Sequence, residues 1–288
     1  MDHLNWNERP EIRRPVIVAA FRGWNDAGEA ASGAISYLKE RWEASRIASI
    51  DPEEFYDFQV ARPEVRHVDG VTRRIEWPAN EFFAARIAGK DVVLFEGVEP
   101  NIRWRNFCQV VGRLAREVGA QRFIGLGAFL ADVPHRGSVP LLGSVPDAAE
   151  RGRFGLLPTN YEGPTGITGV LQDALAGSGL RAESFWAAVP HYAAPGDNPK
   201  ATLGLVDLVT ALLEVPVDTS DLIPLADAWE EQVSETVAEN DTLAQYVERL
   251  EEVGGSGLSP AGEAPGGEEL AAEVERFLRD QSPGTGGS

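Results

Sequence analysis

The feature that most constrains the fold is a repeated unit in which a short apolar run leads directly into a segment with helical periodicity. VIVAAF (16–21) is a continuous β-prone run, and the segment that follows it (23–42) places its apolar side chains on one helical face. DVVLFEG (91–97) leads in the same way into a helix over 103–119. This alternation predicts an α/β fold with a central mixed sheet flanked by helices.

Further elements extend the same pattern. RFIGLGAFL (122–130) and SFWAAVP (184–190) are predicted to be central strands, and a helix is predicted over 200–214 after Pro199. Between 46 and 77, the runs FYDFQV, VRHV and VTRRIEW are typical of shorter, more exposed strands, and we expect a hairpin beside the main sheet.

The character of the sequence changes after Pro216. Residues 221–252 hold ten acidic residues and one arginine, with apolar residues at helical spacing, which indicates a helical extension broken near Asn240 and Asp241. Its charges are interpreted as a solvated face, with an acidic docking face as the alternative. The predicted organisation is an α/β core (12–216), an acidic helical extension (217–253), a flexible linker (254–268), a C-terminal helix (269–281) and a disordered tail (282–288).

Composition excludes several classes of protein. The net charge of −19 opposes binding to nucleic acid. Cys108 is the single cysteine and the four histidines are scattered, so we expect no disulfide, no metal site and no cofactor. The apolar runs fall short of a membrane span and the first residues do not resemble a signal peptide, which favours a cytoplasmic protein that does not bind membranes.

The stretch YEGPTGITGVLQDAL (161–175) carries glycines at positions 163, 166 and 169. No Lys-Ser/Thr pair follows them, and their spacing differs from GxGxxG, so neither nucleotide-binding loop is present. Two interpretations remain. The free backbone N–H groups of a helix start could hold an anion, with Pro164 in the first turn, or the glycines could serve only a tight turn and close packing.

Polar residues follow two of the predicted strands at their carboxyl ends, where open α/β sheets bind ligands. Asp26 with Glu29 also suits a helix cap, which is the competing interpretation. If the turns lie on one edge of the sheet, their side chains converge. The resulting candidate ligand site comprises Gly23, Asn25, Asp26, Glu99, Asn101, Arg103, Tyr161, Gly163, Thr165, Gly166, His191 and Tyr192.

A loop between two predicted strands contains Asp132, His135 and Arg136. This combination could titrate near neutral pH or bind a carboxylate, but we interpret His135 as a solvated loop histidine. No serine lies in a G-x-S-x-G elbow, so the sequence contains no catalytic constellation that we recognise.

Five motifs occur in an order that resembles the proteasome assembly chaperone 2 family: VIVAAFRGWNDAGEAASGAI, LFEGVEPNIRW, GLGAFLADVPHRGSVP, YEGPTGITGVL and PHYAAPGDNPKATLGLVDLV. The resemblance covers about residues 12–215, and the acidic tail is similar to that of actinobacterial members. It implies a phosphorylase- or nucleoside-hydrolase-like fold, homo-oligomers such as trimers, and proteasome subunits as partners. Eukaryotic members carry a C-terminal hydrophobic-Tyr-any-residue tail, which the ending GTGGS does not match.

Two functional hypotheses follow. The first is a non-enzymatic, oligomeric assembly factor whose α/β body and acidic helices contact other proteins. The second is a protein or enzyme that binds an anionic or nucleoside-like molecule at the rim of the sheet, with Arg103 as the counter-charge and Asp26 or Glu99 as polarising carboxylates.

Overall fold

The structure is a computed structural model that describes residues 3–68, 70–145, 148–159, 161–193 and 196–253. A mixed sheet lies at its centre. Within these ranges the sheet has eight strands in the order β1-β3-β6-β7-β2-β8-β10-β9. The predicted linker, C-terminal helix and tail lie outside the described residues. The strands are β1 (Leu4–Trp6), β2 (Val16–Arg22), β3 (Ser45–Ile50), β6 (Asn80–Ile87), β7 (Lys90–Val98), β8 (Arg122–Ala131), β9 (Leu141–Gly143) and β10 (Arg181–Pro190).

The four central strands β7, β2, β8 and β10 are parallel, and the outer strands pair antiparallel. β2 lies between β7 and β8, and its residues 17–21 are all buried. A strand covered on both faces reads as a continuous apolar run, which explains the VIVAAF pattern. The carboxyl ends of β2 and β7 therefore meet at one rim, which is the condition that the sequence analysis set for the candidate side chains to converge.

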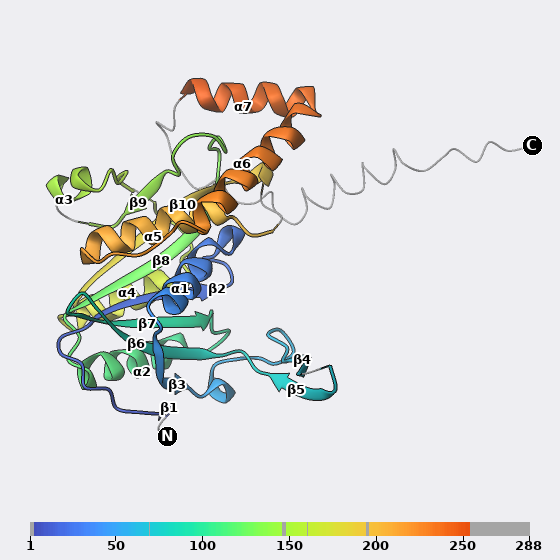
Figure 1. Ribbon diagram of the computed structural model, residues 1–288. Helices are drawn as coiled ribbons and strands as arrows, with labels where there is room; N and C mark the ends of the chain where they lie inside the picture. Colours follow the sequence, from blue (N-terminus) through green and yellow to red (C-terminus); the bar gives the residue numbers. More distant parts are fainter. Residues whose placement is uncertain (1–2, 69, 146–147, 160, 194–195, 254–288) are drawn as a thin grey trace, which may run out of the picture.

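Helices cover both faces of the sheet (Figure 1). α1 (Ala30–Arg41) and α5 (Pro199–Leu213) pack on one face, and α2 (Trp104–Glu117) and α4 (Ile167–Gly177) pack on the other. The two apolar clusters on either side of the sheet hold large residues such as Phe95 and Phe185. A short helix, α3 (Ala148–Arg153), lies outside these layers.

The acidic extension forms α6 (Leu222–Ala238) and α7 (Asp241–Val253), separated where the sequence predicted a break. α6 lies along α5 on the outside of the body (Figure 1), and Leu222 and Ala226 are buried there. The hydroxyl of Tyr37 on α1 donates to the backbone oxygen of Asp218 at 2.7 Å. The extension thus packs against the core of its own chain.

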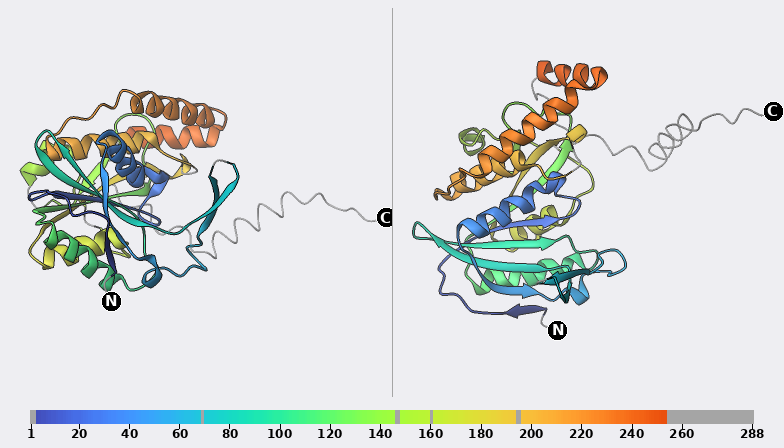
Figure 2. Two further views of the ribbon diagram at one scale, coloured as in Figure 1. Left: turned by 60° about the horizontal axis from the view of Figure 1, so that its bottom comes forward. Right: turned by 45° about the vertical axis from the view of Figure 1, so that its right-hand side comes forward.

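The region between residues 46 and 77 was only partly predicted. β4 (Glu64–Val68) and β5 (Thr72–Glu76) form the expected hairpin as a separate sheet, which stands away from the main sheet (Figure 2). The expected strand FYDFQV (55–60) is wrong: a short 3-10 turn, capped by Asp51 and begun by Pro52, buries Phe55. β6 was not predicted.

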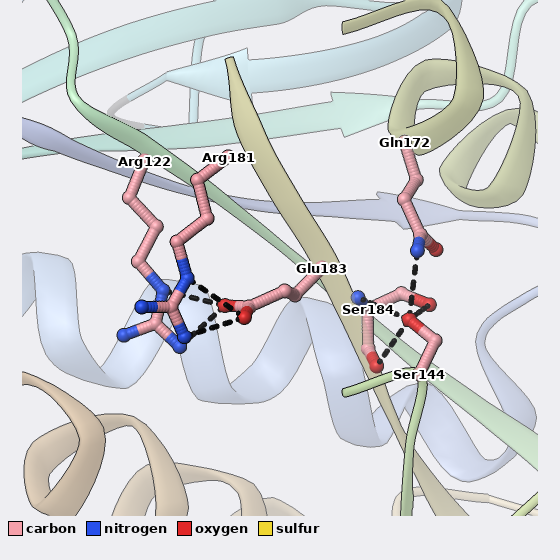
Figure 3. A network of polar contacts seen from close by, with 6 residues as sticks. All are labelled: Arg122, Ser144, Gln172, Arg181, Glu183 and Ser184. Atoms are coloured by element: carbon pink, nitrogen blue, oxygen red, sulfur yellow. Dashed lines mark hydrogen bonds and ion pairs between the residues drawn. The ribbon is translucent and has the colours of Figure 1, made fainter. Parts of the chain in front are cut away.

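A buried polar network lies at the amino ends of β8 and β10 (Figure 3). Glu183, only 3% exposed, accepts from Nε of Arg122 at 2.6 Å and from Nε of Arg181 at 2.9 Å. Beside it, Ser144 Oγ accepts from the backbone N–H of Ser184 at 3.0 Å. Buried charges persist only when paired and hydrogen-bonded, and here the Arg122–Glu183 pair joins β8 to β10.

Candidate functional site

Glu99 joins three elements at the rim of the sheet. It directly follows β7, and its Oε1 accepts from the backbone N–H of Ile167 at 2.8 Å and from Nδ2 of Asn25 at 3.0 Å. Its Oε2 lies 3.4 Å from the backbone nitrogen of Trp24. The carboxylate of Glu99 therefore occupies the amino end of α4, where the sequence suggested that an external anion could sit.

Asp26 supplies a side-chain acceptor to the start of α1, close to the helix cap that the sequence offered as one interpretation, although the residue directly before α1 is Glu29. Its Oδ1 accepts from the backbone N–H groups of Ala31 at 2.8 Å and Ser32 at 3.1 Å, in the first turn of α1. The side chain is buried, and this burial raises the pKa of the Asp26 carboxyl. Its Oδ2, Oδ1 of Asn25 and Oγ1 of Thr168 are buried and have no hydrogen-bond partner within the described residues.

Two glycines allow the side chains of Glu99 and Asn25 to approach the backbone closely. Gly23 has φ of +130°, and a Cβ there would lie 3.1 Å from Cβ of Glu99. A Cβ at Gly166 would lie 1.9 Å from Nδ2 of Asn25. Gly166 is the residue before α4, so the helix begins after the glycine and the prediction that Pro164 lies in its first turn is wrong. The packing interpretation of the glycine motif thus applies at Gly166.

Asn101 and Arg103 lie at the same rim but contact the segment after β3. Oδ1 of Asn101 accepts from the backbone N–H of Asp57 at 3.0 Å. Arg103 forms an ion pair with Glu54. Both side chains therefore stabilise the loop that carries the buried Phe55, and Arg103 is not positioned as a counter-charge beside Asp26.

Tyr161, Gly163 and Thr165 are exposed and their polar contacts are local. The hydroxyl of Tyr161 donates to the backbone oxygen of Pro164 at 2.9 Å. A Cβ at Gly163 would lie 2.5 Å from that same hydroxyl, so the ring folds over the glycine. This turn leads into α4, and among the described residues its side chains make no hydrogen bond to Glu99.

His191 and Tyr192 follow β10 and contact a different group of residues. Nδ1 of His191 lies 3.2 Å from Oδ1 of Asp132, and Tyr246 of α7 donates to that same carboxylate oxygen at 2.8 Å. The hydroxyl of Tyr192 accepts from the backbone N–H of His135 at 2.8 Å. These residues hold the acidic extension on the body.

The environment of His135 differs most from what the sequence predicted. The sequence indicated a solvated loop histidine, but the side chain is only 2% exposed. Its Nδ1 lies 3.0 Å from the hydroxyl of Tyr192, and its Nε2 lies 2.9 Å from Oγ of Ser234 on α6. Burial and the nearby Arg136 lower the pKa of His135, so it is neutral at pH 7.

Lys200 and Arg136 also hold the acidic extension on the body of the protein. Nζ of Lys200 donates to the backbone oxygen of His135 at 2.6 Å and pairs with Glu230 on α6. Arg136 lies 3.5 Å from a carboxylate oxygen of Glu251 on α7. The sequence offered the Asp132/His135/Arg136 loop as a possible carboxylate grip, and the carboxylates it contacts belong to the extension of the same chain.

A cavity of about 680 Å³ lies between the β4–β5 hairpin and the ends of β2 and β7. Its walls include Arg22, Gly97 and Val98 from the rim and Arg74 and Trp77 from the hairpin side. None of the residues predicted for the ligand site lines it. The sequence feature that points to this cavity is the cluster of arginines in an exposed hairpin of an otherwise acidic chain.

The described residues contain no group of three or more histidine, cysteine, aspartate or glutamate side chains placed to hold a metal ion. None of the helices described here is both long and apolar enough to cross a bilayer. Whether any ligand binds at the rim stays a prediction. The geometry defines a rim in which Glu99 accepts from Asn25 and Ile167 and Asp26 accepts from α1, while one further oxygen each of Asn25, Asp26 and Thr168 is buried without a partner among the described residues.

The fold and the site together define a three-layer α/β protein with a mixed sheet, a polar rim and a helical extension packed on one side. The chain belongs to the PAC2 family, whose model matches residues 20–237. The predicted family is therefore confirmed, and with it the phosphorylase/nucleoside-hydrolase-like fold class.

Solved structures support this assignment. A Mycobacterium tuberculosis proteasome-assembly chaperone homologue is 50% identical, with a TM-score of 0.74 over 81% of this chain and 99% of that chain. A PAC2 family protein from Streptomyces avermitilis is 43% identical, with the same TM-score of 0.74 and the same coverage of 81% and 99%. Both relatives are actinobacterial.

The archaeal proteasome activator PbaB from Pyrococcus furiosus is 17% identical, with a TM-score of 0.64 over 82% of this chain and 99% of that chain, and shows the shared fold alone. No curated protein matches the chain.

Proposed function

We propose that this protein is a non-enzymatic, chaperone-like assembly factor that acts in the cytoplasm as a homo-oligomer and binds proteasome subunits. The observation that carries the proposal is the 50% identity to the M. tuberculosis proteasome-assembly chaperone homologue, because this chain spans 99% of that protein. At such identity, the surfaces that contact partners are expected to be related as well as the fold.

The geometry of the rim supports the non-enzymatic part of the proposal. A catalytic carboxylate must reach a substrate, whereas Glu99 is held by Asn25 and Ile167, and Asp26 is held by the first turn of α1. Arg103 is paired with Glu54. Each of these three charged side chains already makes contacts within the chain, and the small-molecule alternative is therefore not favoured.

The test uses purified proteasome α and β subunits mixed with and without the full-length protein. We expect a complex with α subunits on native gels and a change in the rate at which complete particles form, which saturates at stoichiometric amounts of the protein. An effect at trace amounts would indicate turnover and contradict the non-enzymatic part. Unchanged assembly together with no complex would contradict the partner.

Native mass spectrometry of the purified protein tests the oligomer separately. We expect a homo-oligomer, and the family resemblance implies a trimer. A spectrum of monomers at micromolar concentration would contradict the homo-oligomer. It would not bear on the proposed binding to proteasome subunits.

A further inference from the structure

The β4–β5 hairpin is unusual because it has no support on its flanks. It is a sheet of two strands, and among the described residues neither strand pairs with any other. Every residue of both strands is exposed. Two-stranded hairpins are marginally stable alone in water, and open strand edges are templates for pairing with another chain.

The directly opposite residues of this hairpin carry like charges, and the ion pair that joins the strands runs diagonally from Arg66 to Glu76. Arg66 lies opposite Arg74, and Glu64 lies opposite Glu76. Like charges directly opposite are destabilising in an isolated antiparallel pair. Arg66 is offset by both glutamates, which leaves Arg74 as the arginine of this face without an ion-pair partner among the described residues.

The carboxylates around the neighbouring cavity are already engaged. Glu64 and Glu76 both pair with Arg66, at 3.2 and 2.7 Å. Glu81 lies 3.0 Å from Arg46 on β3. Glu96 lies 2.5 Å from Nζ of Lys39 on α1. The cavity therefore has little negative charge left to repel an anion.

The arginines of the cavity are not engaged to the same extent. Arg62 and Arg74 line it, are exposed, and have no ion-pair partner within the described part of the chain. Arg22 reaches only Glu96, at 3.5 Å, and its side chain is 58% exposed. Trp77 lines the same wall and is 49% exposed. The cavity thus combines two arginines that have no ion-pair partner among the described residues, Arg62 and Arg74, with an apolar surface.

We propose that this cavity binds an extended acidic segment of a partner protein, which lies along the open edge of the hairpin with its carboxylates on Arg62, Arg74 and Arg22. Strand edges supply main-chain donors and acceptors, and arginine pairs with carboxylates in bidentate geometry. Val65 and Ile75, directly opposite each other and each 47% exposed, offer apolar contacts to the same segment.

The other classes of anion fit less well. The net charge of −19 opposes nucleic acids and anionic membranes, which present many charges over a large area. A single small anion would use the arginines but neither the strand edges nor the apolar pair. An extended peptide uses all three features at once.

The experiment measures fluorescence anisotropy of a fluorescein-labelled synthetic peptide in which glutamates alternate with valines, titrated with the full-length protein. A peptide with lysines in place of the glutamates is the ligand control. The test variant is Arg62→Glu/Arg74→Glu. The matched control is Arg105→Glu/Arg116→Glu, because these α2 arginines are also exposed and have no ion-pair partner among the described residues. Both variants change the net charge equally.

The design separates binding from folding. Arg74→Glu replaces a like-charge pair with an opposite-charge pair opposite Arg66, so the hairpin is expected to be stabilised by the change. A loss of binding in the test variant is therefore not explained by a disordered hairpin.

We expect the parent to bind the acidic peptide more weakly as salt is raised, and the test variant to bind at least about tenfold more weakly while the control is unchanged. Equal binding of the lysine peptide, equal losses in both variants, or no binding up to about 1 mM protein would overturn the inference. So would a drop in native mass in the test variant without loss of peptide binding, which would assign the hairpin to contacts between copies.

The inference rests on the proposed function only in taking the ligand to be part of another protein. The peptide titration contains no proteasome subunit, so its result is independent of the assembly assay. An active assembly factor that fails the titration would locate its contacts elsewhere.

Discussion

The Oε1 atom of Glu99 lies 2.8 Å from the backbone nitrogen of Ile167, at the first residue of α4. A helix start carries unpaired N–H groups and a partial positive charge, and here the chain supplies the anion itself from the turn after β7. The glycine-rich motif is thus a helix entry built around an internal carboxylate.

Glu99→Ala is expected to destabilise the fold by about 1–3 kcal/mol, because the N–H of Ile167 and the amide of Asn25 lose their acceptor in a partly buried place. Glu99→Gln keeps an oxygen acceptor and should cost less. Urea unfolding followed by circular dichroism measures both. Equal stability of Glu99→Ala and the parent would show that these contacts contribute nothing.

Gly166→Ala should destabilise by roughly 1–3 kcal/mol, because the new Cβ would lie 1.9 Å from Nδ2 of Asn25. Gly177→Ala is the matched control at the other end of α4, where no atom lies within 4 Å of the added Cβ and the gain in helix propensity is up to about 1 kcal/mol. Thermal unfolding distinguishes them. A Gly166→Ala protein as stable as Gly177→Ala would contradict the close approach.

Asp26→Ala removes the acceptor for two N–H groups of α1 and should cost about 0.5–2 kcal/mol. Asp26→Asn keeps an acceptor and removes a buried charge, so it should be close to neutral at pH 7.

The pH dependence of Asp26→Asn has a defined sign. Burial raises the folded pKa of Asp26 above the unfolded value of about 3.9, so the parent gains stability from this group as pH falls from 7 towards 4. Any advantage of Asp26→Asn in the free energy of unfolding must therefore shrink over that range. An advantage that grows as pH falls would contradict the direction of the shift.

Lowering the pH should loosen the acidic extension through His135. Its folded pKa is depressed below the unfolded value of about 6.5, so its stabilising contribution is present above that pH and is lost as pH falls towards the folded pKa. Arg136 and Lys200 oppose its protonation, whereas Glu230 and Glu251 favour it. Hydrogen exchange of α6, corrected for intrinsic rates, should therefore be faster at pH 5.5 than at pH 7.

His135→Gln is the control for that measurement, because glutamine can hydrogen-bond to Tyr192 and Ser234 but does not titrate. The pH dependence of exchange in α6 should be smaller in this variant. The same dependence in both proteins would assign it to groups other than His135.

Elements whose own residues carry a regular apolar pattern could be predicted from the sequence. β2 is buried on both faces and α2 carries a clear apolar stripe, so both could be found from periodicity. Phe55 and Tyr56 looked like a strand because aromatic residues favour strands, but Pro52 and Asp51 begin a turn there and the core takes up the rings.

The candidate site was predicted in part for a similar reason. The sequence placed Glu99 near Asn25 only on the condition that their turns share an edge of the sheet, and the adjacent, parallel strands β2 and β7 meet that condition. The burial of His135 depended on where α6 packs, and the partner of Arg103 depended on the loop after β3. Such contacts between distant segments leave no periodic signal in the sequence.

The position of β2 at the centre of the sheet also bears on how the chain must be made. Its two neighbours, β7 and β8, are encoded by residues 90–98 and 122–131, far beyond the strand itself. The backbone groups at the edges of β2 therefore stay unpaired on the ribosome until those residues have emerged. Pairing between strands so far apart in the sequence also forms slowly. This protein is itself vulnerable to wrong association during the first part of its synthesis.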